Sequence, residues 1–304
     1  MTNFNSARTI GRCIESILSQ SRLKPIELVI VDAASTDGSI DIIKRYEDRG
    51  VRLIVVPKIA CSAGESMAQS LAVGEFIATT NPDVYVPHDW LEKSYAWWLK
   101  GYQVVGGIKI NVGDVYNFAW TAFPDSKPWE EERNELGLST MSIFTPKSVI
   151  LGLLPPSSIF ESRDVELALA AKRNGVKLII DPNIRVLHDN PLFSARNSFK
   201  KSSSYIARHM QILRGSYGKV AFGSESGINL SIKNALSDFL LIDGVKTYYL
   251  YKDEVKSTGL DSGLFEFLFM RWIVKLGQVH GLLKGIMVRK QKNVDFRPIS
   301  VKKN

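Results

Sequence analysis

This sequence of 304 residues is poor in cysteine and has no long apolar run that is free of charge. Its two cysteines, Cys13 and Cys61, are too few for a disulfide framework or a cysteine zinc cluster, so a reducing compartment is expected. The N-terminus lacks the apolar segment of a secretory signal. The most apolar late stretch, Leu264–Met287, is interrupted by four charged residues, whereas a membrane-spanning helix needs roughly 20 mostly apolar ones. We therefore expect a cytoplasmic protein that is soluble or lies on a membrane surface.

What the sequence does have is a globular composition with an uneven charge. Hydrophobic residues make up 45% and charged residues 23% of the chain, which excludes wholesale disorder. Residues 1–189 hold 20 Lys and Arg against 23 Asp and Glu, whereas residues 190–304 hold 19 against 8. A near-neutral front and a basic rear predict two parts with different tasks, 1–190 for chemistry and 191–304 for contact with something anionic.

The front part alternates between strand and helix patterns. Buried strands are predicted at 26–31, 51–56 and 75–80. Helices are predicted at 7–19, 40–49 and 63–73. This order is typical of an α/β fold with a mostly parallel sheet flanked by helices, in which ligands bind beyond the carboxyl ends of the strands.

More elements are expected downstream, and the basic rear part is predicted to be mainly helical. Strands are predicted at 104–112, 177–180 and 184–188. Helices are predicted at 89–99, 164–174, 193–214, 228–242 and 264–287. Residues 117–138 have no clear pattern and are expected to be rich in loops.

Two aspartates follow predicted strands at the ligand edge. Asp32 ends the first strand, where a short acceptor can read a base or a ribose. Asp83, in Asn81-Pro-Asp83, follows the third strand, where a carboxylate can hold a divalent cation that neutralises a diphosphate. Simpler interpretations stay open. Asn-Pro-Asp is also ordinary turn chemistry, and the alternative for Asp32 is capping of the next helix, which suits Asp37 better.

Two later residues could also carry chemistry. Asp164 opens a predicted helix and could act as a general base that takes a proton from an acceptor hydroxyl. Capping is the alternative, because a helix start stabilises an acid. His188 ends a predicted strand, where a neutral imidazole could complete a metal site, although a lone histidine is more often a packed polar residue.

The basic rear part raises the question of its partner. The segment 269–285 alternates apolar residues with Arg and Lys, which fits a surface helix on an anionic membrane and fits a core-packing helix equally well. A nucleic-acid partner is not expected, because the basic residues lack interleaved aromatic platforms and no nucleic-acid motif is present.

The order and spacing of these signals resemble a known family. Asn5-Ser-Ala-Arg-Thr-Ile-Gly-Arg is followed by Pro25-Ile-Glu-Leu-Val-Ile-Val-Asp-Ala-Ala-Ser-Thr-Asp-Gly-Ser. Gly74-Glu-Phe-Ile-Ala then precedes Asn81-Pro-Asp-Val, and Asp164-Val-Glu-Leu follows. Over residues 2–188 the chain resembles the family-two, GT-A-fold glycosyltransferases, and its Asn-Pro-Asp resembles the rhamnosyltransferase-like members.

The resemblance implies an inverting transferase with Mg²⁺ or Mn²⁺ and a nucleotide-diphosphate sugar as donor. Asp164 matches the catalytic base, and Asp83 and His188 match the metal contacts. The implied contacts of the nucleotide sugar are Asn5, Asp32, Asn81 and Asp83. The expected reaction moves the sugar to a lipid-linked or polysaccharide acceptor at the inner face of the cell membrane.

Departures from the family pattern keep a second hypothesis open. The motif's first acid is Asn81, the acid that usually follows Asp32 is Ala33, and Arg163 precedes the base. The alternative is therefore a GT-A-fold binding protein that has lost turnover. A nucleotidyltransferase is disfavoured, because the Gly-rich basic loop it needs is not visible. The family also begins with a longer buried strand, so an upstream start codon is a further hypothesis.

Overall fold

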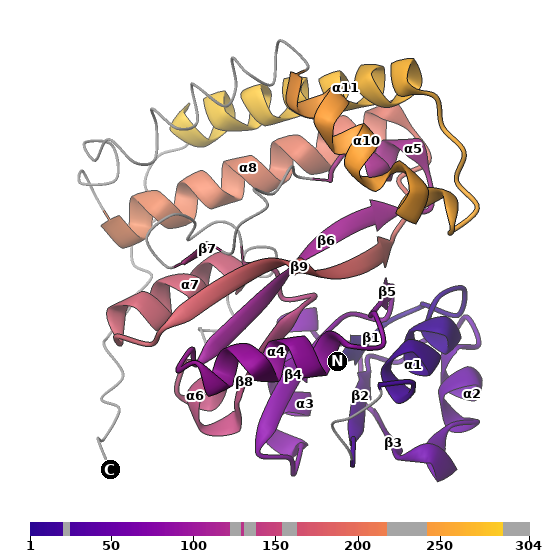
Figure 1. Ribbon diagram of the computed structural model, residues 1–304, viewed down its shortest axis with the longest axis vertical. Coiled ribbons are helices and arrows are strands. Elements are labelled where there is room, and N and C mark those ends of the chain that lie inside the picture. The colour runs from indigo at the N-terminus through magenta and orange to yellow at the C-terminus, as the bar shows by residue number, and fades with distance from the viewer. Residues whose placement is uncertain (21–24, 122–128, 131–137, 154–162, 218–241, 288–304) are drawn as a thin grey trace. The chain divides into compact units, whose positions relative to one another are not determined.

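The computed structural model describes residues 1–20, 25–121, 129–130, 138–153, 163–217 and 242–287 (Figure 1). The chain divides into two compact units. The described part of unit 1 comes from Met1–Lys109 and Pro124–Asp189, and that of unit 2 from Ile110–Phe123 and Asn190–Arg297.

Unit 1 begins with a small parallel sheet in the order β1-β2-β3. The strands are β1 (Thr2–Asn3), β2 (Leu28–Asp32) and β3 (Val51–Val55). All five residues of β2 are buried, as expected for the middle strand of a sheet covered by helices. Asn3 pairs with Asp32, and Asp32 pairs with Val55, so the three strands end level at one edge.

The helices of this half follow the predicted order with shorter bounds. They are α1 (Ile10–Leu18), α2 (Ser39–Lys44), the 3₁₀ helix η1 (Glu47–Arg49) and α3 (Cys61–Leu71). The predicted helix 40–49 is divided in two, and Gly50 ends it with a φ of 88°, a left-handed conformation that glycine adopts at no steric cost.

The second sheet has the path β4-β8-β6-β9-β5, with β7 paired to β9. Its strands are β4 (Phe76–Thr79), β5 (Val84–Tyr85), β6 (Val104–Val112), β7 (Trp129–Glu130), β8 (Ile143–Pro146) and β9 (Leu178–Asp189). Its helices are α4 (Trp90–Leu99), α6 (Lys147–Leu153) and α7 (Arg163–Arg173).

The α/β class is confirmed, and the expected parallel pairing is seen between β1 and β2 and between β2 and β3. The pairings of β4 and β6 with β8, and of β5 and β7 with β9, are antiparallel. The physical reason is β8, a strand that the sequence pattern did not reveal and that pairs with β4 in place of a parallel neighbour. The two strands expected at 177–180 and 184–188 are one continuous strand, β9.

One hydrophobic core joins both sheets of unit 1. It includes Ile14 of α1, Ile30 of β2, Trp90 of α4, Phe144 of β8 and Val186 of β9. The core fixes the carboxyl end of β2 and the short strand β5 in one rigid body, and this arrangement positions the candidate site.

Unit 2 contains the helices α5 (Val115–Phe118), α8 (Ala195–Tyr217), α10 (Ile242–Lys256) and α11 (Leu264–Met287). The helical character of the rear part is thus confirmed, and α11 has its predicted bounds. α10 was not predicted, and the predicted helix 228–242 lies almost entirely outside the described residues. None of the described helices has a stretch long and apolar enough to cross a membrane.

α8 and α11 pack closely because glycine and serine lie between them. A Cβ on Gly277 would lie 2.6 Å from the carbonyl oxygen of Phe199, so only glycine allows this approach. Ser202 Oγ donates a 2.6 Å hydrogen bond to the carbonyl of Val274. The buried Arg271 donates to the carbonyl oxygen of Thr121 at 2.6 Å. One face of α11 is therefore fully committed to packing within unit 2.

The two thiols are expected to differ in reactivity. Cys13 is buried, and burial raises the pKa of its thiol to about 12, with a further contribution from Asp83. Cys61 is exposed at the start of α3. Because the thiolate is the nucleophile, iodoacetamide at pH 8 should label one thiol in the native protein and two in guanidinium chloride. Mass mapping of the native label to Cys13 would contradict this description.

Candidate functional site

Asp32 lies at the carboxyl end of β2 and is fully buried. Its carboxylate accepts hydrogen bonds from Asn3 Nδ2 at 2.6 Å and from the amide and hydroxyl of Ser35, both at 2.7 Å. These bonds hold the loop that follows β2 against the end of β1. Asp32 therefore shapes the edge where a ligand would bind, and its predicted contact with a base stays a prediction.

Asn3 is a residue that the sequence reasoning missed. Its side-chain nitrogen orients Asp32, while its Oδ1 is buried and accepts no hydrogen bond from the described residues. An acceptor without a donor is costly in a protein interior. The end of β1 thus presents a hydrogen-bond acceptor that the described residues do not satisfy.

Asn5 forms hydrogen bonds to the same loop after β2. Its backbone has a φ of 51°, a left-handed conformation that asparagine tolerates better than most residues. Its amide donates to Ser35 Oγ at 2.8 Å, and its Oδ1 accepts from the Thr36 amide at 2.9 Å. Asn5 and Asp32, both predicted nucleotide contacts, are therefore connected through Ser35.

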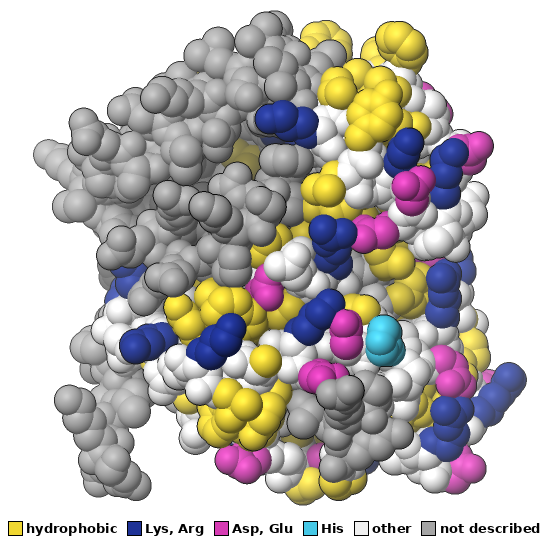
Figure 2. Space-filling model, viewed as in Figure 1, with side chains coloured by type: hydrophobic (Ala, Val, Ile, Leu, Met, Phe, Trp, Pro, Cys, Tyr) yellow, Lys and Arg dark blue, Asp and Glu magenta, His cyan; other side chains and the backbone are white. Residues whose placement is uncertain are grey.

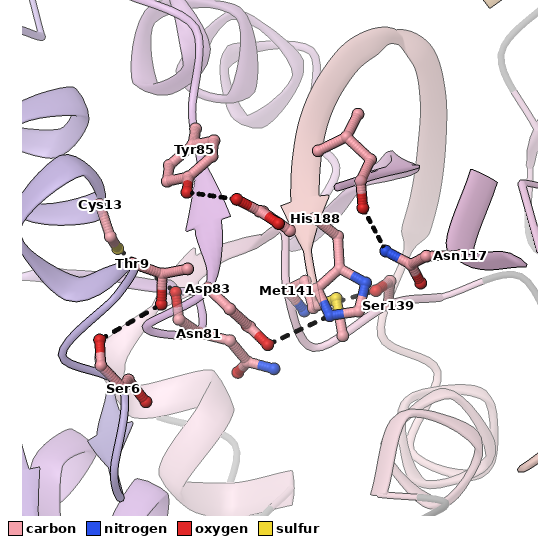
Figure 3. Close-up of polar contacts among 12 residues, drawn as sticks. Ser6, Thr9, Cys13, Asn81, Asp83, Tyr85, Asn117, Ser139, Met141 and His188 are labelled. Carbon is pink, nitrogen blue, oxygen red and sulfur yellow. Dashed lines mark hydrogen bonds and ion pairs between the residues drawn. The ribbon is translucent and has the colours of Figure 1, made fainter. Parts of the chain in front are cut away.

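Asp83 and His188 form the centre of the candidate site (Figure 3). β5 pairs with β9 so that Val84 lies opposite His188, and the Asp189 amide donates to the Asp83 carbonyl at 2.7 Å. As a result, Asp83 Oδ2 lies 3.3 Å from His188 Nε2. His188 is buried, whereas the Asp83 side chain is 21% exposed. The structure thus brings together the two residues that were predicted to contact a metal.

This separation suits a shared divalent cation. Adjacent ligands of an octahedral Mg²⁺, each about 2.1 Å from the ion, lie about 3 Å apart. Among the described residues no group of three or more His, Cys, Asp and Glu side chains is arranged to hold a metal. Two protein ligands would leave the remaining positions to water and to phosphate oxygens, which is the usual way in which Mg²⁺ is bound beside a nucleotide.

Asn81 supplies the turn that delivers Asp83 to this place. Its carbonyl accepts from the Val84 amide at 3.2 Å and from Cys13 Sγ at 3.3 Å. The turn interpretation of Asn-Pro-Asp is therefore correct, and it does not exclude a role in binding. In Figure 3 the Asn81 side chain extends alongside that of Asp83.

Lys109 connects Asp83 with Asp164 and was missed by the sequence reasoning. Asp164 is half-buried in the first turn of α7. The half-buried Lys109 on β6 has its pKa lowered by desolvation, an effect opposed by the nearby carboxylates of Asp164 and Asp83. The ammonium group thus interacts with both acids. The available signal was that Lys109 is the single charged residue of β6.

A second group of charges lies beside His188. Asp189 accepts a hydrogen bond from Tyr85 at 2.8 Å and two from the Arg8 guanidinium, each at 3.0 Å. Burial, together with this carboxylate, raises the pKa of Tyr85. The Arg12 guanidinium lies 4.1 Å from the centre of the Tyr85 ring. Arg8 therefore already pairs with Asp189, and its charge also interacts with that of Asp83.

A cavity of about 470 Å³ lies elsewhere in unit 1. Its lining includes Leu28 and Val29 of β2 and Phe76 and Ile77 of β4. None of the acids discussed above lines it, so the candidate site is the polar edge formed by the strand ends.

Comparison with known sequences gives a family match over the first part of the chain. Residues 1–151 match the family model described as Glycosyl transferase family 2. The chain is 39% identical over 112 residues to a Bacillus subtilis (strain 168) protein named as the glycosyltransferase EpsE, covering 34% of this chain and 39% of that protein. It is 29% identical over 97 residues to the poly(ribitol-phosphate) beta-glucosyltransferase of Bacillus spizizenii, covering 30% of this chain and 15% of that protein. The chain thus spans well under half the length of these relatives.

Solved structures share the fold over nearly the whole chain. The mannosyltransferase PcManGT from Pyrobaculum calidifontis, in complex with GDP-Man and Mn²⁺, has a TM-score of 0.60 at 16% identity and covers 92% of this chain and 85% of its own. Residues 1–349 of S. aureus TarS, in complex with UDP, have a TM-score of 0.52 at 16% identity. The match covers 97% of this chain and 93% of that one. The chain therefore has the GT-A fold, and its residues 1–151 match the model of glycosyl transferase family 2.

Proposed function

We propose that this protein is a glycosyltransferase that moves a sugar from a nucleotide-diphosphate sugar to a lipid-linked or polysaccharide acceptor. The observation that carries the proposal is the 3.3 Å approach of Asp83 and His188 at the polar edge of a GT-A fold. The family match over residues 1–151 supports the reaction class. A structural neighbour that binds GDP-Man with Mn²⁺ supports a donor of this kind.

Asp83 and His188 are the residues that would hold Mg²⁺ or Mn²⁺. When bound, the cation would offset the charge of the departing diphosphate. Asn81, Asp83, Asn5 and Asp32 would bind the nucleotide sugar, with the last two fixing the loop after β2 through Ser35. This loop would be preorganised before the donor arrives, because its hydrogen bonds are already made.

Asp164 is the proposed general base. Its carboxylate would take the proton from the acceptor hydroxyl while that oxygen attacks the anomeric carbon from the side opposite the diphosphate, which inverts the configuration. Lys109, which interacts with both Asp164 and Asp83, would help to keep the Asp164 carboxylate ionised. In this scheme residues 1–190 carry the chemistry. Residues 191–304 serve the acceptor side and associate peripherally with the membrane.

A catalytically degenerate binding protein is the second candidate. Two observations favour it: Asn81 replaces an acid, and the Asp32 carboxylate is already bonded to Asn3 and Ser35. Such a protein would bind a donor without consuming it. Slow hydrolysis of the donor, followed as nucleotide diphosphate release, separates the two candidates.

A thermal-shift panel of nucleotide-diphosphate sugars, with and without Mn²⁺, tests the donor site. A ligand at one hundred times its Kd stabilises the native state by about 2.7 kcal/mol, which corresponds to about 4 °C for a chain of this size. We expect one donor to give such a shift only when Mn²⁺ is present. If every donor leaves the melting temperature unchanged with the metal, the proposed site is wrong.

A further inference from the structure

α11 carries a row of large apolar side chains that are exposed to solvent, between 36% and 87% each. This row, called here the α11 stripe, consists of Phe265, Phe269, Trp272, Leu276, Val279 and Leu283. The spacing alternates between four and three residues. At about 100° per residue, all six fall within an arc of about 80°. The stripe therefore forms one continuous face along the helix.

The stripe is distinct from the face of α11 that packs in unit 2. Phe267, Val274 and Gly277 are buried, and Gly277 approaches the backbone of α8. α11 thus has one apolar face against its own unit and a second apolar face toward solvent. A contiguous exposed apolar surface of this length is unusual for a protein without a partner.

α10 also carries exposed apolar side chains, and a lysine lies beside them as another lies beside the stripe. Tyr249 and Leu250 are 57% and 44% exposed. The Lys252 ammonium lies 5.1 Å from the centre of the Tyr249 ring, and Lys284 is exposed beside the stripe. Figure 2 shows hydrophobic side chains gathered over α10 and α11, with basic and acidic side chains close by. Residues 190–304 hold 19 Lys and Arg against 8 Asp and Glu.

We propose that the α11 stripe, with Tyr249 and Leu250, is the surface by which this protein binds an anionic lipid bilayer. An apolar helix face rich in Phe and Trp and bordered by lysines lies in the plane of the interface, with its apolar side chains at the boundary of headgroups and acyl chains. The lysines are attracted to the negative surface potential. This inference rests on the membrane association in the proposed function and names the residues responsible for it.

A second copy of the chain fits the same surface less well than a bilayer does. The spacing of the stripe also suits a coiled coil, in which charged residues at the flanking positions select the partner. Here those positions are Glu266, Ile273 and His280 on one side and Leu268, Lys275 and Leu282 on the other. They offer few opposite charges to pair, and a dimer would bring two basic regions together. An anionic surface has the complementary charge.

Flotation of the full chain with vesicles tests the proposal. We expect the protein to float with vesicles of phosphatidylcholine and phosphatidylserine at low salt and to stay behind with phosphatidylcholine alone. The double variant Phe269→Asp and Leu276→Asp should lower partitioning by at least about tenfold, because it places charges in the apolar boundary. Lys284→Gln should lower it by about fivefold, the contribution expected of one lysine near such a surface.

Leu99→Asp is the matched control, because Leu99 is 66% exposed at the end of α4 in unit 1 and lies outside the stripe. It should float like the wild type. Circular dichroism of each variant verifies folding. The proposal is overturned if the wild type does not float, or if the double variant floats equally well. A dimer in sedimentation that the double variant disrupts, without wild-type flotation, would assign the stripe to a second copy.

The same variants separate this inference from the proposed function. The donor-induced thermal shift should survive in the double variant, because the stripe contains none of the donor-site residues. Flotation with no donor shift in the wild type would contradict the glycosyltransferase site alone. A donor shift without flotation would contradict the membrane surface alone.

Discussion

Asp164→Asn should lower kcat by about 10²–10⁴-fold while leaving the donor-induced thermal shift intact, because a positioned general base typically contributes this much. The amide has nearly the shape of the carboxylate but does not accept a proton at neutral pH. The half-buried residue lies in the first turn of α7 and interacts with Lys109, so the change removes the base without emptying the site. Transfer of labelled sugar to the acceptor provides the measurement.

Asp41→Asn is the control for this variant. Asp41 is an exposed acid in the first turn of α2, so its loss reproduces the effect of removing a negative charge from a helix start. That effect is worth at most about 1 kcal/mol at an exposed position. Full activity in Asp41→Asn and a large loss in Asp164→Asn would assign the loss to proton transfer. Equal, small losses in both would mean that Asp164 only caps its helix.

The sequence allowed the first half of the fold to be predicted because its signals are local. β2 and β3 are short apolar runs between helical patterns, and a buried strand that ends at Asp32 identifies the ligand edge. The second sheet was harder. β5 has only two residues, too few for any periodicity, yet its pairing with β9 is what brings Asp83 to His188.

The hydrogen bonds around the site could not be predicted from the sequence pattern. Arg8 bonds Asp189 across 181 residues of sequence, and Tyr85 bonds the same carboxylate across 104. Asn3 orients Asp32 only because β1 and β2 are in register. Such contacts depend on the tertiary arrangement of strand ends. The positions of Asp83, His188 and Asp164 at strand and helix ends made them candidates, and the resemblance to a family, which carries information about tertiary structure, assigned their roles.

Asp83→Asn should abolish the part of the donor-induced thermal shift that requires Mn²⁺ and lower kcat by about 10³-fold. The reason is that Asn81-Pro-Asp83 contains a single carboxylate, so the metal would lose its only charged ligand from this turn. A bound cation supplies several kcal/mol of charge stabilisation at a departing diphosphate, and each 1.36 kcal/mol is a factor of ten in rate. His188, 3.3 Å away, would remain as a neutral ligand of low affinity.

The matched control for Asp83 is Asp89→Asn, which removes a carboxylate six residues further on. Asp89 forms a partly exposed ion pair with Lys93 at 2.9 Å, and a pair of this kind contributes little to stability. Its variant should keep the metal-dependent shift. If Asp83→Asn also keeps that shift, the Asp83–His188 pair is structural, and the metal must be sought elsewhere. If Asp83→Asn loses the shift but still binds the donor without metal, the carboxylate acts through the cation and the nucleotide is held independently, by the loop that Asn5 and Asp32 fix.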